Sequence, residues 1–340
     1  MVNWSIKRRS SATCSLLPPQ SHRWHIPQVP PTFFSVVLGI AGLSNAWRVG
    51  HRVWGLSTAI GESIAFCAVM VWLGLLCLYG LTWLLARPRA LQDLRDPTSG
   101  NFGGLIGVAT LLVAGIILPY SRSIALLLAG IGGTYTLLFA IFQTAAHWRS
   151  DRTPELTTAG LYLPTVAGLF VSGSTAAILG FEDVGQLCFG AGLFSWLGIE
   201  SVLLNRLYTG AGIPKGLRPG LGIQYAPPAV GALTYISITS GPPDLFARAL
   251  VGYGLLQMLV VARLFPWIRQ QPFSPAYWGF TFGAASLATS SLLMIERGER
   301  SVLLMLAPCL FVAANLIIAI ITFRTLGLIA RWLAAAPAQD

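Results

Sequence analysis

The chain has 340 residues, of which 54% are hydrophobic and only 10% are charged, and its mean hydropathy is +0.68. Because soluble domains carry about 25% charged residues, this composition excludes an ordinary soluble protein and predicts a polytopic α-helical membrane protein. The apolar runs are continuous and do not alternate, which argues against a transmembrane β-barrel. The formal charge of +10 comes mostly from arginines in the expected loops, so we interpret it as a signal of topology and not of nucleic-acid binding.

The N-terminal residues 1–30 contain basic residues and prolines but no long apolar segment, so we expect a cytoplasmic tail and not a signal peptide. Ten apolar segments of about the length that a bilayer requires follow this tail. They are residues 32–49, 58–85, 102–119, 124–147, 157–179, 184–207, 223–240, 245–268, 275–296 and 302–332. Residues 31–332 are therefore predicted to form one transmembrane domain, and residues 333–340 a short cytoplasmic C-terminal tail.

The basic residues predict how these segments are oriented. An even number of spans places both termini on the same side of the membrane. That side carries sixteen of the Lys and Arg residues, and the opposite side carries six. The positive-inside rule therefore predicts that both termini are cytoplasmic.

A short pattern recurs along the chain, and internal repeats are a primary guide to architecture. It consists of an aromatic residue, a Pro or Gly two positions later and a Gly six positions later. Two of its five copies are imperfect, with Ser in place of Pro or Asn in place of the aromatic residue. The copies are Tyr277/Gly279/Gly283, Tyr225/Pro227/Gly231, Tyr162/Pro164/Gly168, Phe33/Ser35/Gly39 and Asn101/Gly103/Gly107. They fall on the first, third, fifth, seventh and ninth expected spans.

This alternation predicts five helical hairpins with quasi-five-fold symmetry, in which the odd helices form an inner ring around a central pore. Proline removes a helical hydrogen bond, so prolines inside these spans favour a water-lined interior. The residues expected to line the pore or to kink its helices are Gly39, Gly107, Pro164, Gly168, Pro227, Gly231 and Gly283. For each glycine, close packing of helices through small residues is the alternative.

The odd spans have no Asp, Glu, Lys or Arg in their central portions, but they contain several Ser and Thr residues. A pore lined by hydroxyl and backbone groups binds its ion weakly, as conduction requires, and the lack of a carboxylate ring leans towards anions. Phe282 precedes the shared glycine of its copy and is the only aromatic residue at that position among the five. It is the best candidate for a hydrophobic gate, and a packing or lipid-facing role is the alternative.

Two carboxylates, Glu62 and Glu200, lie within even spans. An ionisable group inside a membrane is costly and suggests a function such as proton coupling, but an interfacial position for Glu62 or a partner on a neighbouring helix for Glu200 would also explain them. The scattered cysteines and histidines suggest neither a metal site nor a disulfide framework, and no motif indicates a nucleophile, a phosphate-binding loop or a cofactor. An enzyme is therefore not expected.

Several strings resemble the TehA family of bacterial tellurite-resistance proteins, which is grouped with slow-type anion channels of plant guard cells and fungal malate and sulfite transporters. They are residues 160–167 (GLYLPTVA), 190–197 (GAGLFSWL), 252–257 (GYGLLQ), 263–267 (RLFPW) and 278–283 (WGFTFG). The resemblance implies ten helices in five hairpins, a homotrimer with one pore in each protomer, and a place in the bacterial inner membrane. It also implies a phenylalanine on the ninth helix that occludes the pore, at Phe282 or, with a shifted alignment, at Phe280.

The resemblance further implies conduction of small monovalent anions such as chloride and nitrate, selected by ease of dehydration. The alternative function is a secondary transporter of tellurite, sulfite or C4-dicarboxylates, coupled to protons through Glu62 or Glu200. Transporters commonly show a two-fold repeat and a polar site at the membrane midplane. The five-fold repeat and the uncharged odd spans therefore favour the channel. The expected partners are small inorganic anions, membrane lipid and further copies of the chain.

Overall fold

The computed structural model describes residues 29–151 and 153–335, so most of the predicted tails, 1–30 and 333–340, lies outside the described residues. The described residues form helices and connecting turns without a strand, which confirms the predicted all-α class. Nine of their helices are long and apolar enough to cross a bilayer. They are Pro31–Trp54, Thr58–Leu85, Ser99–Ile117, Arg122–Arg149, Ala159–Ile178, Glu182–Thr209, Leu245–Ile268, Pro275–Glu296 and Leu303–Trp332.

The seventh expected span, residues 223–240, differs from the others. It contains α8 (Ala226–Ile238), which has 13 residues, and α8 is preceded by the 3-10 segment η6 (Lys215–Ile223). A helix of 13 residues rises only about 20 Å, which is less than the hydrocarbon thickness of a bilayer. Nine of the ten expected spans thus correspond to long apolar helices within the described part of the chain. The remaining one, the seventh, corresponds to the shorter α8.

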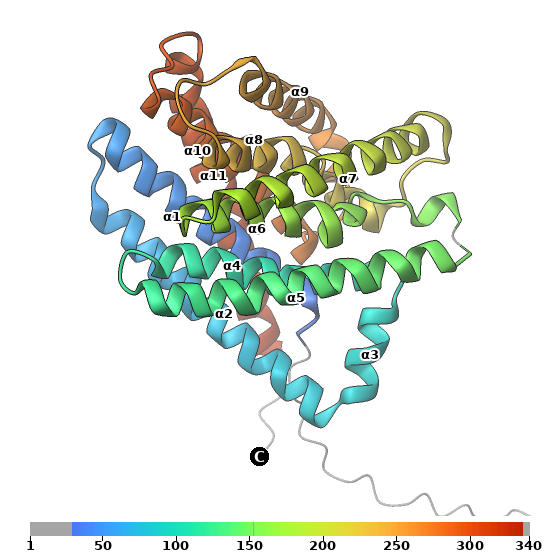
Figure 1. The fold of residues 1–340 in the computed structure, drawn as a ribbon. Helices are drawn as coiled ribbons and strands as arrows, with labels where there is room; N and C mark the ends of the chain where they lie inside the picture. Colours follow the sequence, from blue (N-terminus) through green and yellow to red (C-terminus); the bar gives the residue numbers. More distant parts are fainter. Residues whose placement is uncertain (1–28, 152, 336–340) are drawn as a thin grey trace, which may run out of the picture.

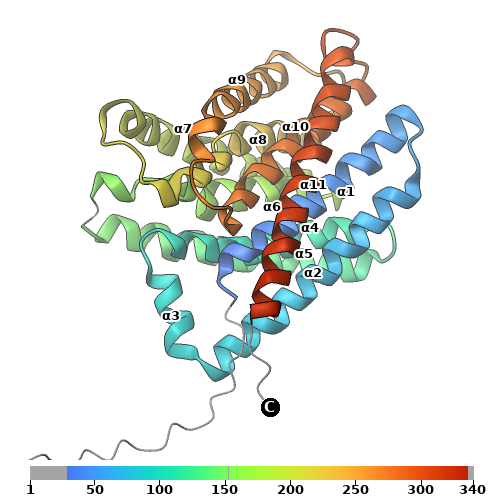
Figure 2. The same cartoon turned by 180° about the vertical axis from the view of Figure 1, so that it is seen from behind.

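The helices are of two kinds. The helices on the even spans are long and have few buried residues, whereas those on the odd spans are shorter and more deeply buried. Figures 1 and 2 show the arrangement of both sets from opposite sides. The outer helices are α2 (Thr58–Leu85), α5 (Arg122–Arg149), α7 (Glu182–Thr209), α9 (Leu245–Ile268) and α11 (Leu303–Ala335). The inner helices are α1 (Phe34–Trp54), α4 (Leu105–Ile117), α6 (Gly168–Ile178), α8 and α10 (Gly279–Glu296).

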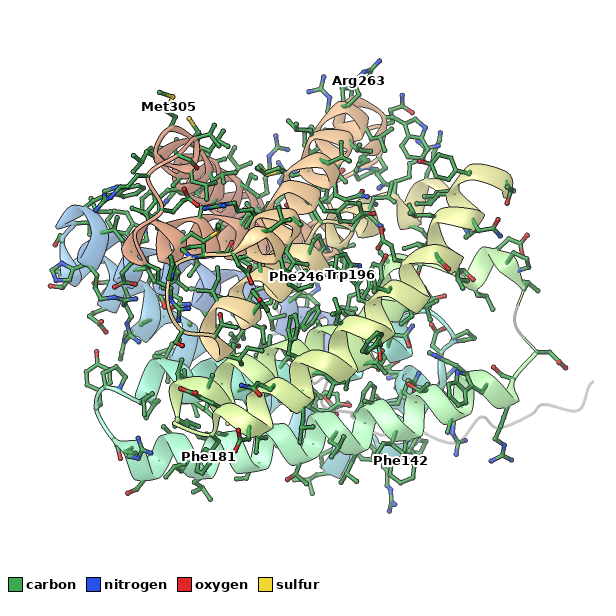
Figure 3. All side chains as sticks on the ribbon, turned by 45° about the horizontal axis from the view of Figure 1, so that its top comes forward. Phe142, Phe181, Trp196, Phe246, Arg263 and Met305 are labelled. Atoms are coloured by element: carbon green, nitrogen blue, oxygen red, sulfur yellow. The ribbon has the colours of Figure 1, made fainter. Side chains whose placement is uncertain are left out.

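Burial separates the two sets. In the most apolar part of each outer helix at most 33% of the residues are buried, while in α10 the share reaches 89%. Large apolar side chains of the outer helices, such as Phe142 on α5, point away from the bundle (Figure 3). The short α3 (Arg87–Arg95) follows α2 and lies apart from the bundle (Figure 1). Apolar exposure on the outer helices fits contact with lipid, because lipid chains are as apolar as these side chains.

Each inner helix is entered through a turn that is not α-helical. These turns are η1 (Pro31–Phe33), η2 (Ser99–Gly104), the π-helical η5 (Leu163–Ala167), η6 and η7 (Pro275–Trp278). The repeated pattern lies at these junctions. Tyr225, for example, is the N-cap residue of α8, and Tyr277 lies in η7. The repeat in the sequence therefore marks equivalent places in the structure.

The entry turns change the interpretation of the prolines, which in the sequence favoured a water-lined interior. Pro227 and Pro228 lie in the first turn of α8, and Pro164 lies at the start of η5. A proline in the first turn of a helix removes no intrahelical hydrogen bond, because the N–H groups there have no helical acceptor. These prolines start their helices and do not break them, so they need no water-lined interior to compensate for a lost bond.

Candidate functional site

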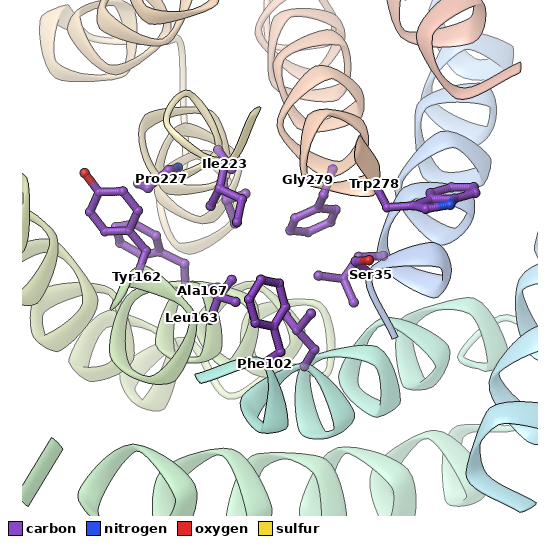
Figure 4. A pocket seen from close by; sticks show the side chains of 15 residues that line it. Ser35, Phe102, Tyr162, Leu163, Ala167, Ile223, Pro227, Trp278 and Gly279 are labelled. Atoms are coloured by element: carbon purple, nitrogen blue, oxygen red, sulfur yellow. The ribbon is translucent and has the colours of Figure 1, made fainter. Parts of the chain in front are cut away.

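The inner helices enclose a narrow cavity of about 50 Å³ (Figure 4). Every one of them, or the turn that leads into it, contributes to the wall, and no charged residue does. The wall contains Ser35, Leu38, Phe102, Leu105, Tyr162, Leu163, Ala167, Phe170, Ile223, Ala226, Pro227, Val230, Trp278, Gly279 and Phe282. Since an ordered water needs about 10–15 Å³, this narrow cavity holds only a few water molecules.

A wide cavity of about 410 Å³ lies among the C-terminal halves of the same five helices. Its lining residues include Arg48, Arg52 and Arg297 and no Asp or Glu. Polar side chains on four of the five helices also line it, namely Ser44, Asn45, Ser174, Thr175, Ser237, Ser286 and Thr289. The wide cavity therefore combines apolar wall with hydroxyl groups and positively charged side chains, whereas the narrow cavity is almost wholly apolar and neutral.

A vestibule of about 310 Å³ lies at the opposite end, where the entry turns of the inner helices meet. It shares Phe102 and Ile223 with the narrow cavity. Its one charged lining residue is Arg206, which is only 6% exposed and donates hydrogen bonds to the carbonyl oxygens of Pro154 (2.9 Å) and Glu155 (3.4 Å). The three cavities thus follow one another along the inner helices, with positive charge at both ends.

Phe282 lies between the narrow and the wide cavity and is the one described residue that lines both. Its side chain is 7% exposed. Gly42 on α1 makes room for the ring, because a Cβ atom at Gly42 would lie 3.2 Å from Phe282 Cδ2. Phe282 therefore lies where an apolar ring separates two cavities.

Phe280, the other gate candidate, lines none of the three cavities. Its ring stacks on Tyr277 with centroids 5.9 Å apart and meets Phe265 edge-on at 6.1 Å. It also packs against Gly222 in η6. Two residues correspond to about 200° around a helix, so Phe280 and Phe282 point to nearly opposite sides of α10.

The shared glycines of the repeat lie at contacts between helices, and Gly39, Gly107, Gly168, Gly231 and Gly283 line neither the narrow nor the wide cavity. A Cβ atom at Gly39 would lie 2.3 Å from Thr281 Oγ1, and one at Gly283 would lie 2.7 Å from the ring of Tyr225. This corrects the pore-lining interpretation for the glycines in favour of close packing. Among the two predicted prolines, Pro227 lines the narrow cavity and Pro164 does not.

Glu200 on α7 is 7% exposed and accepts hydrogen bonds from four side chains. Tyr162 and Trp196 Nε1 (2.9 Å) donate to Oε2, while Gln224 Nε2 (3.1 Å) and Tyr253 (2.5 Å) donate to Oε1. Tyr162 also lines the narrow cavity, so Glu200 lies directly behind its wall. The partners on neighbouring helices that the sequence left open are therefore present.

Glu62 lies near the start of α2, just beyond its first turn, and pairs with Arg48, whose Nη2 is 2.8 Å from Oε2. It also accepts a hydrogen bond from Tyr120, which lies between α4 and α5, and this bond raises the pKa of the phenol. Glu62 lines none of the three cavities. Its position near the start of α2, paired with Arg48, agrees with the interfacial alternative to a transport role, which stays a prediction.

Sequence reasoning missed the cationic ends of the cavities. The prediction of membrane topology used Arg48, Arg206 and Arg297 only as charges on one side of the membrane or the other. Each of them lines a cavity in the structure. Their signal in the sequence is weak, because an arginine near the end of a span looks the same whether it faces lipid headgroups or a cavity. Within the described residues, no three His, Cys, Asp or Glu side chains come together in a way that could hold a metal ion.

These features define a class, a multi-pass α-helical membrane protein whose inner helices enclose a row of cavities. Residues 28–326 match the family model SLAC1, described as voltage-dependent anion channel. The chain belongs to this anion-channel family. It is 33% identical to the tellurite resistance protein TehA homolog of Haemophilus influenzae, over 88% of this chain and 90% of that protein.

More distant relatives are similar over much of the chain as well. The S-type anion channel SLAH2 of Arabidopsis thaliana is 21% identical over 81% of this chain and 54% of its own length. An uncharacterized transporter of Methanocaldococcus jannaschii is 19% identical over 78% of this chain and 83% of its own. The similarity to the plant channel thus covers about four fifths of this chain but only about half of the plant protein.

Proposed function

We propose that the chain is an anion channel in which ions pass through the vestibule, the narrow cavity and the wide cavity, and in which Phe282 closes the path. The observation that carries the proposal is that Phe282 lines both the narrow and the wide cavity. A hydrophobic constriction can stop an ion by excluding water. The ring of one side chain separates the two cavities, so removing it joins them.

The charge distribution supports anions as the permeant species. The wide cavity has three arginines in its wall and the vestibule has one, and neither wall contains Asp or Glu. The apolar narrow cavity favours ions that lose water easily, so chloride and nitrate are the proposed substrates. Similarity to a tellurite resistance protein links the chain to tellurite resistance in the same proposal.

The finer architecture belongs to this proposal too. The alternation of buried and exposed helices and the five equivalent entry turns support five hairpins with quasi-five-fold symmetry, with α8 completing the inner ring. A bacterial inner membrane, cytoplasmic termini and a homotrimer of separate pores complete it. The exposed apolar side chains of the outer helices leave surface for lipid and for neighbouring copies.

The test measures current through purified protein in planar bilayers under a chloride gradient. We expect wild type to be nearly silent and Phe282→Ala to conduct anions at least about tenfold better, which corresponds to a barrier lowered by about 1.4 kcal/mol. Phe280→Ala is the matched control, since it removes the same side chain two residues away without touching a cavity wall. It should behave as wild type does.

Two results would contradict the proposal. Current from Phe280→Ala together with silence from Phe282→Ala would place the gate elsewhere. No current from either variant, with labelled sulfite or dicarboxylate still accumulating in proteoliposomes under a proton gradient, would replace the channel with a secondary transporter.

A further inference from the structure

The C-terminal ends of all five inner helices converge on the wide cavity. Residues within a few positions of each end line its wall, namely Arg52 for α1, Pro119 for α4, Ile178 for α6, Ser237 for α8 and Arg297 for α10. The direct contacts between α1 and α10 agree with a parallel arrangement, because Gly39 lies against Thr281, Gly42 lies against Ala285, and Arg52 pairs with Glu296. The inner helices therefore point their C-terminal ends the same way.

This arrangement opposes the passage of anions. The C-terminal end of a helix carries about half a negative charge on its unpaired carbonyl groups. Several such ends around one cavity attract cations and repel anions, unless other charges compensate for them. A path for anions therefore needs positive groups at this position.

Arginines from neighbouring segments supply them. Arg48 Nη1 donates to the carbonyl of Ile116 at the end of α4 (3.2 Å), and Arg122 Nη2 donates to that of Leu179 after α6 (2.8 Å). Arg297 Nη1 donates to the carbonyl oxygen of Thr239, the C-cap residue of α8, at 2.6 Å. The ends of α4, α6 and α8 thus each carry an arginine cap.

The carboxylates near these arginines do not face the cavity. Glu62 pairs with Arg48, Glu296 pairs with Arg52 (2.6 Å), and neither carboxylate lines the wall. Arg297 has no carboxylate partner among the described residues. A guanidinium group has five N–H donors, and one of those of Arg297 is used on Thr239. Its charge is therefore the least compensated of the three in the wall.

A neutral donor lies deeper in the same cavity. Ser286 is 2% exposed, lines the wide cavity and follows Phe282 by four residues, which is about one helical turn. Its hydroxyl group has no hydrogen-bond partner within the described part of the chain. An anion beside Phe282 could accept this hydrogen bond, while the arginines at the C-terminal ends of the inner helices attract it electrostatically.

We infer that the wide cavity is a binding site for a small inorganic anion and that Arg297 makes it accept anions, because Arg48, Arg122 and Arg297 offset the negative helix ends around it and Arg52 adds a further positive side chain to its wall. The inference rests on the proposed channel function and adds the element that selects the sign of the charge. The ligand class is a monovalent inorganic anion that keeps much of its hydration shell, because the cavity is large and polar.

The experiment uses the full chain with Phe282→Ala, in planar bilayers under a KCl gradient. Arg297→Gln keeps an N–H donor for Thr239 but removes the charge, and Arg297→Lys keeps the charge. We expect Arg297→Gln to lower the chloride-to-potassium permeability ratio about fivefold and to raise the half-saturating chloride concentration by a similar factor, while Arg297→Lys stays close to its parent. The difference should shrink in about 1 M salt, where screening is strong.

Arg263→Gln is the matched control, since Arg263 lies on the outer helix α9, is exposed and lines none of the three cavities (Figure 3). An unchanged permeability ratio in Arg297→Gln, or an equal loss in Arg297→Lys, would overturn the inference, as would current that does not saturate with chloride. If Arg297→Gln does not fold, Arg52→Gln replaces it with the same expected direction. Silence of Phe282→Ala itself would instead contradict the channel proposal, so the two failures are distinguishable.

Discussion

Glu200 links four segments of the chain through one side chain. Its donors come from the turn before α6, from the end of η6, from α9 and from α7 itself. A buried carboxyl group with this many donors is fixed where it lies, because both of its oxygens have hydrogen-bond partners and the network is satisfied. We therefore regard Glu200 as an anchor for the entry turns of α6 and α8 and not as a proton carrier.

Replacing Glu200 by Gln should destabilise the protein. Each carboxylate oxygen accepts two bonds, so the amide nitrogen of Gln faces two donors in either orientation, and each donor left unsatisfied costs about 1–3 kcal/mol. We expect a lower melting temperature in detergent, while Glu182→Gln at the exposed start of α7 leaves it unchanged. A stable Glu200→Gln protein that has lost only proton-driven uptake would support the transporter instead.

The packing of elements depends on glycines that allow helices to approach closely. Gly107 on α4 faces α5, where a Cβ atom would lie 2.3 Å from Thr136 Oγ1 and 3.0 Å from the carbonyl oxygen of Gly132. Gly133, one residue further along α5, has open space around its Cα atom. The two positions therefore separate the effect of contact from the effect of helix propensity.

Gly107→Ala and Gly133→Ala should change stability in opposite directions. Alanine is favoured over glycine in a helix by about 0.5–1 kcal/mol, which is the whole effect expected at Gly133. At Gly107 the overpacking cost of about 1–3 kcal/mol outweighs that gain. The melting temperatures of the two purified variants against wild type check this, and equal shifts would show that Gly107 is not a contact.

The sequence predicted the helices and their entry turns well, but it was less informative about the contacts between helices. Hydropathy located the spans, and the repeat located the entry turns, because both depend on local patterns. Which side of a helix Gly107 or Gly283 faces depends on neighbours that are distant in sequence, so the sequence left both a pore-lining and a packing role open for these glycines. The caps on α4, α6 and α8 were missed for the same reason, since Arg48, Arg122 and Arg297 reach carbonyl groups at least 57 residues away.

Phe282 stood out in the sequence as the one aromatic residue among five equivalent positions, and it lines both the narrow and the wide cavity, while its role as a gate stays a prediction. The seventh span was overestimated in length, because residues 223–225 and 239–240 continue its apolar run in the sequence but lie outside α8 (Ala226–Ile238). An apolar run reports burial or lipid contact, and it does not distinguish a 3-10 entry from an α-helix.

On the scale of the whole molecule, the count of basic residues predicts which end of the row of cavities faces the cytoplasm. The vestibule lies at the end with the entry turns, and the wide cavity lies at the other end. With cytoplasmic termini, the vestibule opens inward and the arginine-lined wide cavity opens outward.

Cysteine labelling can check this orientation. In a variant without the native cysteines, Ser301→Cys between α10 and α11 should react with a membrane-impermeant maleimide in intact cells. Ser150→Cys after α5 should react only in permeabilised cells. The reverse labelling pattern would show the opposite orientation in the membrane, with Arg297 at the cytoplasmic end of the cavities.

The difference in width between the cavities also has an electrical consequence. The narrow cavity of about 50 Å³ lies between a vestibule of about 310 Å³ and a cavity of about 410 Å³, which have room for conducting water and ions. If these cavities form the proposed conducting path, most of the membrane voltage falls across the short apolar stretch at Phe282 and not across the full bilayer. An anion that crosses this stretch changes its energy by about 2.3 kcal/mol per 100 mV. Flow through such a path depends steeply on voltage even though no charged segment has to move.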